Sequence, residues 1–505
     1  MEEVKKLSKE FRDWVKPFLK PVGILWIIIT VGMFAILRAN FSYMDDLART
    51  VEGYKGWGNF SRYLSNFLAM IVNGNTTVAD ISPWPQILAA LIMAIAGVML
   101  LYIVYGRKKF WWWELVAVAI LALNPYFLEC LSYKFDAPYI AVAILAMIIP
   151  LLFRKRKAGW YVLAVMVGTL VTCTTYQAAL GVLPMLVMLV MMRMWGRKES
   201  VKEVGGFGVW SVIGYVGGLV IFRVFLMKQV NAYVATELPG IGELLSTVIG
   251  NLGEYYKLML MDFPKIWVGL IGLVVLGFVV MAVMRTERKV WEAGIVAVLT
   301  LVAMSLVCFG IYPLMVQPLF EPRAMFGVMV MVAMLGVVVV EDRKAEGKSK
   351  CWRSWQSMIW GGFVVVALVL SYEFGIFSFM YGNALVLQGE YTDFRIETAI
   401  EDLEETVLDD WSEKVSITVM GTVGIAPALE DVVVRFPILE RLVPIEFESG
   451  YWGEYKLFRY YGLRALQGDP YEAVSTEGCL KEKQGYYQDI WRCGHEKVVV
   501  ELKEV

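Results

Sequence analysis

The sequence predicts an all-α polytopic membrane protein with about 11 transmembrane helices and a small extracytoplasmic α/β domain at its C-terminal end. Hydrophobic residues make up 58% of the 505 residues, more than is usual in soluble domains. Most of them lie in runs of about 17–25 residues, the length that a helix needs to cross a bilayer. The last 125 residues are instead rich in acidic residues and in the short patterns typical of strands.

Eleven apolar segments are predicted to span the membrane. Those at 112–128 and 138–153 are short for a bilayer, and the two within 159–194 form a hairpin with almost no loop, so the count depends most on these. The eleven lie at residues 21–38, 86–105, 112–128, 138–153, 159–176, 178–194, 206–226, 266–284, 290–309, 324–340 and 359–380.

Basic residues orient these segments. They precede the first span and then gather in alternate loops: Lys5–Lys20, Arg107–Lys109, Arg154–Lys157, Arg193–Lys202, Arg285–Lys289 and Arg343–Arg353. Because cytoplasmic loops carry an excess of Lys and Arg, we expect a multi-pass protein of the cell membrane with a cytoplasmic N-terminus. Eleven crossings then place residues 381–505 outside. The first span lacks a small-residue cleavage site and is expected to remain as a signal anchor.

Two long outer loops belong to the transmembrane domain, which we expect to comprise residues 1–380. These loops, 39–85 and 227–265, contain apolar residues at helical spacing, which is typical of amphipathic helices lying on a membrane surface. The apolar positions are Leu47, Val51 and Tyr54 in the first loop and Leu244, Val248, Leu252 and Tyr255 in the second.

The C-terminal region, 381–505, changes character. It contains 24 Asp and Glu against 12 Lys and Arg. Its pattern predicts a helix over 394–408 and strands over 415–420, 432–436 and 497–502, a small mixed α/β domain. Cys479 and Cys493 lie in it and could form a disulfide in an oxidising outer compartment.

Several chemistries are excluded by composition. The chain has a single histidine, His495, which argues against a His-based zinc site or a Ser–His mechanism in the membrane part. A formal net charge of −1 provides no global field for nucleic acid, so no nucleic-acid partner is expected. No P-loop or dinucleotide fingerprint occurs between a strand and a helix.

An acidic pair, Asp45 and Asp46, lies just outside the first span. Charged groups are costly to desolvate near a bilayer, so such a pair is either functional or caps a helix. One carboxylate could take a proton from an attacking hydroxyl, because desolvation and its neighbour raise its pKa, or the pair could coordinate a divalent cation. The alternative is that Asp46 caps a helix beginning at Leu47.

Two arginines are candidate phosphate contacts. Arg49 follows Asp45 by one helical turn, which favours a local ion pair, although its planar guanidinium also matches phosphate oxygens. Arg323, in the sequence Glu321-Pro322-Arg323, lies at the outer mouth of the tenth span, where a cation needs a partner. That partner is either Glu321 or the phosphate of a lipid-linked substrate.

The second outer segment, between the third and fourth spans, is dense in polar and aromatic side chains. Glu129, Tyr133, Lys134 and Asp136 together resemble a wall that faces a sugar, since aromatic rings stack on sugar C–H surfaces and carboxylates bind hydroxyls. Lys134 is a further candidate for the phosphate. The alternative is that Asp136, followed by Pro138, simply caps the next helix.

The motifs in the first two outer segments resemble the type II Gtr-like glucosyl transferases, bacterial polytopic enzymes linked to glycan modification of the cell envelope. The resemblance covers roughly residues 20–400 in layout. The matching motifs are Tyr43-x-Asp45-Asp46-x-x-Arg49, Gly53-Tyr54-x-x-Trp57, Arg62-x-x-Ser65 and Asn124-Pro125-Tyr126-x-Leu128-x-x-x-Ser132-Tyr133-x-Phe135-Asp136.

The resemblance implies a GT-C glycosyltransferase architecture, a polyprenyl-phosphate sugar as donor, usually glucose, and an envelope glycan as acceptor on the outer face. It implies that Asp45 or Asp46 is the catalytic acid/base, and it places Tyr43 and Arg62 among the substrate-binding residues. Inverting single displacement is the expected mechanism, with a divalent cation possible. The competing prediction is a flippase or other transporter of lipid-linked sugars, although no internal repeat is visible and the spans are almost free of charge at their centres.

Overall fold

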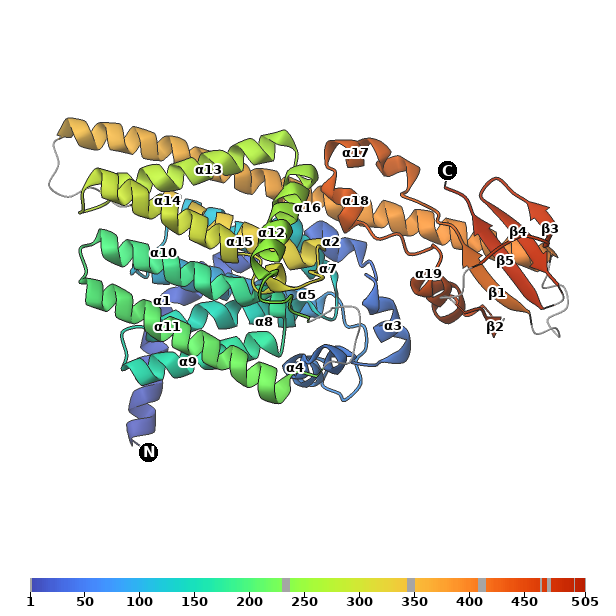
Figure 1. Cartoon of the computed structure of the whole chain (residues 1–505), viewed down its shortest axis with the longest axis horizontal. Coiled ribbons are helices and arrows are strands. Elements are labelled where there is room, and N and C mark those ends of the chain that lie inside the picture. The colour runs from blue at the N-terminus through green and yellow to red at the C-terminus, as the bar shows by residue number, and fades with distance from the viewer. Residues whose placement is uncertain are drawn as a thin grey trace.

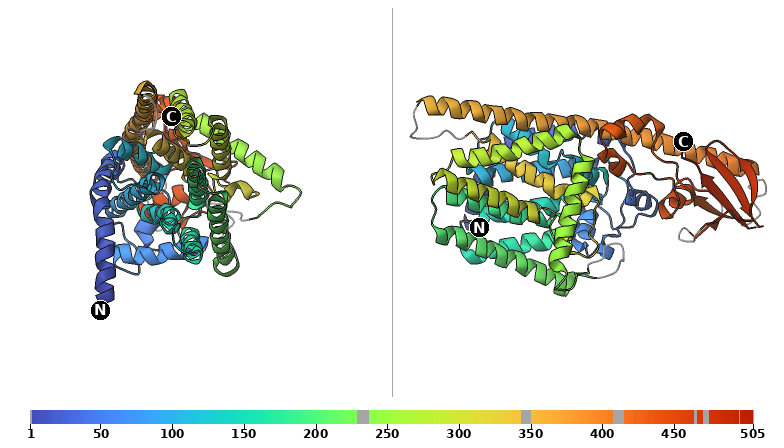
Figure 2. Two further views of the ribbon diagram at one scale, coloured as in Figure 1. Left: turned by 90° about the vertical axis from the view of Figure 1, so that its left-hand side faces the viewer. Right: turned by 45° about the horizontal axis from the view of Figure 1, so that its top comes forward.

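The computed structural model describes residues 2–228, 237–342, 350–406, 415–463, 466–469, 474–494 and 496–504. His495 and the larger part of the predicted basic segment 343–353 therefore lie outside the described residues. A helical bundle forms one end of the molecule, and a small sheet lies at the other, joined to the bundle by one long helix (Figures 1 and 2).

Apolar helices build the bundle. Eight of the described helices are long and apolar enough to cross a membrane, and α6 with α7, bent by 69°, could form a ninth. The predicted spans at 138–153 and 159–176 correspond to shorter apolar helices, so the count of eleven stays a prediction. The helices are α1 (Glu2–Gly32), α2 (Phe34–Ala39), α5 (Trp84–Tyr105), α6 (Trp112–Val118), α7 (Pro125–Ser132), α8 (Ala137–Ile148), α9 (Ala158–Cys173), α10 (Val182–Gly196), α11 (Val201–Ile221), α13 (Lys265–Met284), α14 (Val290–Val307) and α15 (Pro322–Val340).

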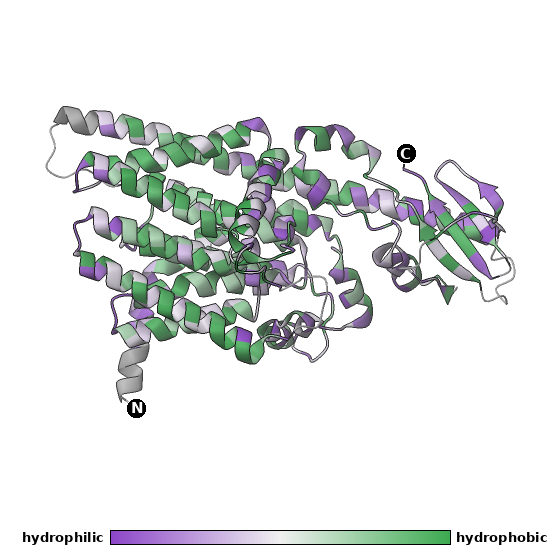
Figure 3. Cartoon of the chain, viewed as in Figure 1, coloured by the Kyte–Doolittle hydropathy of each residue, from purple (hydrophilic) through white to green (hydrophobic). Residues whose placement is uncertain are grey.

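The bundle has two chemically different ends. The loop between α10 and α11 and the loop between α13 and α14, both basic, lie at the end far from the sheet, which we name the basic end (Figure 1). The opposite end, which faces the C-terminal domain, is named the domain end. Apolar residues dominate the helices between the two ends (Figure 3). This segregation is the pattern that the positive-inside rule predicts for a membrane protein.

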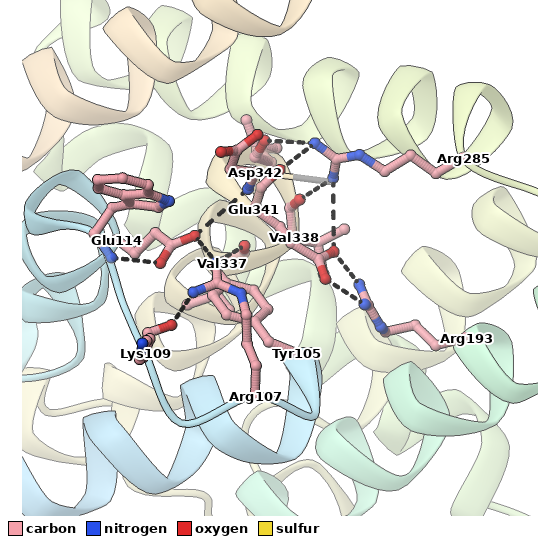
Figure 4. Close-up of polar contacts among 12 residues, drawn as sticks. Tyr105, Arg107, Lys109, Glu114, Arg193, Arg285, Val337, Val338, Glu341 and Asp342 are labelled. Carbon is pink, nitrogen blue, oxygen red and sulfur yellow. Dashed lines mark hydrogen bonds and ion pairs between the residues drawn. The ribbon is translucent and has the colours of Figure 1, made fainter. Parts of the chain in front are cut away.

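Helix α15 lies at the centre of the bundle, since 94% of its apolar window is buried. At the basic end, Glu341 follows this helix and accepts two hydrogen bonds from Arg193 of α10, each 2.9 Å long. Arg285, at the end of α13, donates to the carbonyl of Glu341 at 2.7 Å and to the carbonyls of Val338 and Val339 (Figure 4). The carbonyls of Val338 and Val339, in the last turn of α15, thus accept hydrogen bonds from the guanidinium of Arg285.

Helix α16 (Lys350–Thr406) connects the bundle to the C-terminal domain. It has 57 residues, so at 1.5 Å per residue it is about 85 Å long. The predicted span 359–380 and the described part of the predicted helix 394–408 are both segments of it, and no break marks residue 380.

The C-terminal domain contains one five-stranded sheet in the order β2-β1-β5-β4-β3. β1 is parallel to β2 and β5, whereas β3, β4 and β5 form an antiparallel meander. The disulfide that the sequence left open is present: Cys479 and Cys493 join the start of β3 to the end of β4. The strands are β1 (Ser416–Met420), β2 (Leu466–Gln467), β3 (Leu480–Gln484), β4 (Gln488–Cys493) and β5 (Lys497–Leu502).

The predicted strand over 432–436 is wrong, because these residues lie in helix α17 (Glu430–Arg435) and at its end. Three consecutive valines favour a strand locally. However, Glu430 and Asp431 stabilise the positive N-terminus of a helix, and Pro437 follows its end. Two further short helices, α18 (Ile438–Leu442) and α19 (Tyr451–Tyr455), complete the domain.

Three helices lie outside the bundle core in the predicted outer loops. They are α3 (Asp45–Glu52) and α4 (Tyr63–Asn73) in loop 39–85, and α12 (Leu244–Asp262) in loop 227–265. The domain packs against this region: Tyr43 and Tyr381 both donate hydrogen bonds to the carbonyl of Leu442, at 2.8 and 3.3 Å. The C-terminal domain is therefore part of the surroundings of the acidic pair.

Candidate active site

The acidic pair lies in the first turn of α3. The chain leaves α2 at Asn40 and turns through Met44, which has a positive φ of 47°. Asp46 reaches back and accepts a hydrogen bond from the backbone N–H of Tyr43 at 3.2 Å. The carboxylate thus satisfies a backbone donor just before the helix. The alternative that Asp46 caps a helix beginning at Leu47 is wrong, because the helix begins at Asp45, its N-cap residue is Met44, and no side chain caps it.

Asp46 is fully buried and also joins α3 to the second outer segment. Its carboxylate accepts from the backbone N–H of Lys134 at 2.9 Å and lies 3.9 Å from the guanidinium of Arg49. Burial raises the pKa of Asp46 to about 8, while Arg49 and the N–H of Lys134 act in the opposite direction. Asp46 is fully buried and already accepts hydrogen bonds from backbone N–H groups. Its carboxylate therefore cannot reach the hydroxyl of a substrate.

Asp45 is different, because 42% of its side chain is exposed. One of its oxygens lies 3.4 Å from Arg49, the local ion pair that the spacing predicts, and Asp45 is near enough to Tyr133 to act on it electrostatically. An exposed carboxylate held by a buried cation is available to a substrate from outside.

Arg49 is buried beneath this carboxylate. Its guanidinium lies 4.5 Å from the ring centroid of Trp57 and forms an ion pair with Asp136. Trp57 donates to the second oxygen of Asp136 through its indole N–H. Arg49 is therefore engaged by carboxylates and an aromatic face, an arrangement that orients Asp45.

Lys134 is also buried, and its ammonium group bonds to Asp80 at 3.0 Å and to Ser42 at 3.3 Å. These contacts tie the second outer segment to the loop before α5. Partial burial raises the pKa of the Asp80 carboxyl, but the hydrogen bonds from Ser82 and the charge of Lys134 outweigh this effect. The pKa of Asp80 is therefore lowered.

Arg323 pairs with Glu129, and this partner was not among the sequence-based alternatives. Glu129 on α7 is fully buried and accepts from the Arg323 guanidinium at 2.6 Å and from its backbone N–H. The Arg323 guanidinium lies 5.7 Å from the ring centroid of Tyr133, whose ring lies 4.7 Å from that of Tyr43. Glu321 is instead the residue that precedes α15, with no side-chain capping bond.

Arg62 lies beside this group through Tyr176. Its guanidinium lies 4.8 Å from the ring centroid of Tyr176 and donates to Gln177 at 3.2 Å. The hydroxyl of Tyr176 donates to the carbonyl of Arg323 at 3.0 Å. Two cations thus flank one tyrosine. Gln177 lies between the predicted spans 159–176 and 178–194, and only the fold brings Tyr176 and Gln177 to this group.

We name these residues the domain-end cluster: Tyr43, Asp45, Asp46, Arg49, Trp57, Arg62, Glu129, Tyr133, Asp136, Tyr176 and Arg323. They come from α3, α7, α15 and the connecting segments, which meet at the domain end. Among the residues that the structure describes, no group of three or more His, Cys, Asp or Glu side chains could hold a metal ion. The side chains of the domain-end cluster supply carboxylates, guanidinium groups and aromatic faces.

Comparison with known proteins identifies the family of this chain. The sequence model of the glucosyl transferase GtrII family matches residues 34–340, which include the bundle from α2 to α15. A protein of Salmonella phage P22, described as an uncharacterized 55.3 kDa protein in the gtrB 5′ region, is 24% identical over 495 residues, which are 94% of this chain and 98% of that one. No solved structure matches the chain. The chain belongs to the GtrII glucosyl transferase family.

Proposed function

We propose that this membrane glycosyltransferase moves a sugar, glucose or another hexose or N-acetylhexosamine, from polyprenyl phosphate to an envelope glycan. The reaction takes place at the domain end, which faces the outside of the cell. Family membership supports sugar transfer, and the segregation of basic loops to the opposite end supports this orientation. Nucleotide sugars remain in the cytoplasm, so an outer site needs a donor carried by lipid.

In the proposed reaction, Asp45 takes the proton of the acceptor hydroxyl as its oxygen attacks the anomeric carbon. The bond between that carbon and the phosphate oxygen breaks, the configuration inverts, and the lipid monophosphate leaves with the bonding electrons. Arg323 stabilises the charge that develops on the phosphate, with Arg62 on the other side of Tyr176. Glu129, Tyr133 and Asp136 shape the sugar side of the site.

The observation that carries this proposal is the contrast among the carboxylates of the domain-end cluster. Asp46, Asp136 and Glu129 are buried and engaged by donors. Asp45 has 42% of its side chain exposed. A general base must reach its substrate, so exposure selects Asp45.

An apolar cavity between α10 and α11 supports a lipid donor. Its volume is about 580 Å³, and its walls come from Leu183, Val187 and Met191 on one helix and Gly208 and Val212 on the other. Leu183 follows Gln177, the partner of Arg62, by less than two helical turns. A prenyl chain could occupy this cavity while its phosphate lies at the domain end.

The test is sugar transfer by purified protein in detergent, with polyprenyl-phosphate [¹⁴C]glucose as donor and envelope glycan as acceptor. Asp45→Asn is expected to lower kcat at least 100-fold, within the usual contribution of a general base. Asp431→Asn, on the exposed face of α17, is the matched control and should keep full activity. Full activity of Asp45→Asn would contradict the role of Asp45. Movement of the lipid-linked sugar across a vesicle membrane without sugar transfer would favour a flippase.

A further inference from the structure

Arg441 belongs to α18 of the C-terminal domain, outside the residues that match the family model. Its guanidinium reaches the bundle and forms an ion pair with Asp262, the last residue of α12. The second terminal nitrogen donates to the carbonyl of Phe320, and the same nitrogen lies 3.6 Å from the sulfur of Met325. Arg441 thus contacts residues on both sides of Arg323 along the chain.

The partner of Arg441 extends the contact to α7. Asp262 is buried and accepts a hydrogen bond from the hydroxyl of Tyr126 at 2.7 Å. Tyr126 lies on α7 one helical turn before Glu129, and Phe320 lies three residues before Arg323. One guanidinium and one carboxylate therefore hold the segments that carry both members of the Glu129–Arg323 pair.

We propose that Arg441 is a positioning residue through which the C-terminal domain sets the geometry of the Glu129–Arg323 pair. This geometry in turn sets the affinity of the site for the phosphate of the donor. This inference rests on the proposed function, because it assigns the phosphate to Arg323. Docking of the domain alone does not require Arg441, since Tyr43 also binds the carbonyl of Leu442 and Tyr455 of α19 donates to Glu52 of α3 at 3.0 Å.

The physical basis is the planar fork of the guanidinium. One group of Arg441 satisfies a buried carboxylate and a backbone carbonyl at the same time, with two nitrogens held at a fixed angle. Without it, Asp262 is a buried carboxylate with one remaining neutral donor, Tyr126, and the carbonyl of Phe320 loses its partner. Lysine offers one compact ammonium group, so it restores the charge but not both contacts.

The experiment measures donor KM, acceptor KM and kcat for Arg441→Ala, Arg441→Lys and the control Arg435→Ala, an exposed arginine of α17. Arg441→Ala is expected to raise donor KM about tenfold and to leave acceptor KM within twofold, with partial recovery in Arg441→Lys. Arg435→Ala should match wild type. Binding of polyprenyl monophosphate alone should weaken by a similar factor in Arg441→Ala, which gives a readout that does not depend on turnover.

A double variant separates positioning from general destabilisation. If Arg441 acts through Arg323, then Arg441→Ala adds less than twofold to donor KM in an Arg323→Ala background. Full additivity, equal changes in both KM values, or wild-type kinetics of Arg441→Ala would each overturn the inference. If one of these three results occurs while Asp45→Asn still abolishes transfer, the inference about Arg441 fails but the proposed function stands. Absence of sugar transfer by wild type would overturn both.

Discussion

Asp45 and Asp46 are adjacent in the chain, yet the fold places them in different environments. The first turn of α3 directs Asp45 toward solvent and Asp46 into backbone N–H donors of the second outer segment. Residues one apart on a helix point about 100° away from each other, so one of a pair can face a core while the other faces outward. The motif therefore combines a structural carboxylate with an accessible one.

Burial of Asp46 leads to a pH-dependent stability. Its pKa rises from 3.8 to about 8 on folding, so the folded state binds more protons than the unfolded state between these values. The stabilising contribution is complete below pH 3.8 and is lost as the pH rises toward 8. We expect the free energy of unfolding of wild type, relative to Asp46→Asn, to fall over this range.

The measurement is denaturant unfolding of both proteins in detergent at several pH values. Comparison with Asp46→Asn removes the contribution of the other titrating groups, and Asp431→Asn serves as a second reference at an exposed position. A difference that is constant with pH, or that increases with pH, would contradict the assignment of a raised pKa to Asp46.

At the scale of elements, α15 is held at both ends. At the basic end Glu341 binds Arg193, and at the domain end Arg323 binds Glu129. The apolar character of α15 is visible in the sequence, but its central position depends on all the helices around it. Its partners at the two ends are separated from it by 148 and 194 residues, so local patterns do not identify them.

The pair at the basic end gives an element-scale prediction. Glu341→Gln keeps the shape of the side chain but removes the negative charge that pairs with Arg193 in a mostly buried place. Breaking one side of a buried pair costs on the order of 3 kcal/mol, so the variant should unfold at lower denaturant concentration. Glu292→Gln, which removes an exposed pair with Lys289, is the control and should change stability by less than about 1 kcal/mol. Equal stability of the two variants would contradict a role for Glu341 in holding α15.

At the scale of the whole molecule, α16 extends the bundle into the C-terminal domain as one continuous helix. A helix without a break transmits orientation between the two parts better than a flexible linker does. The domain returns to the bundle through α18, where Leu442 and Arg441 meet residues of the domain end. The site is therefore assembled from the beginning, the middle and the end of the chain.

The orientation in the membrane gives the whole-molecule prediction. Val434 lies exposed on α17, and Ser200 lies exposed in a loop at the basic end. A membrane-impermeant thiol reagent should label Val434→Cys on intact cells and should label Ser200→Cys only after permeabilisation. Cys130, Cys173 and Cys308 are buried, and Cys351 is replaced by serine in both variants so that it contributes no label. The reverse labelling pattern would contradict an outward-facing site.

The sequence by itself determined the features that depend on composition and local order. Long apolar runs identified a membrane protein, and the motifs around Asp45 and Asn124 identified the family. The acidic tail and its spacing indicated an α/β domain in which a disulfide was left open. The number of spans does not follow from the apolar runs alone, because α8 and α9 are short and α6 and α7 are bent by 69°.

Only the tertiary structure decided which carboxylate is exposed, that Arg323 pairs with Glu129 rather than Glu321, and that Arg441 reaches the same region. It also overturned the strand expected at 432–436, where helix α17 forms. Local patterns report the preference of a residue for a helix, a strand or a membrane. Burial and ion pairing depend on which distant segments pack together, and this depends on the packing of the whole chain.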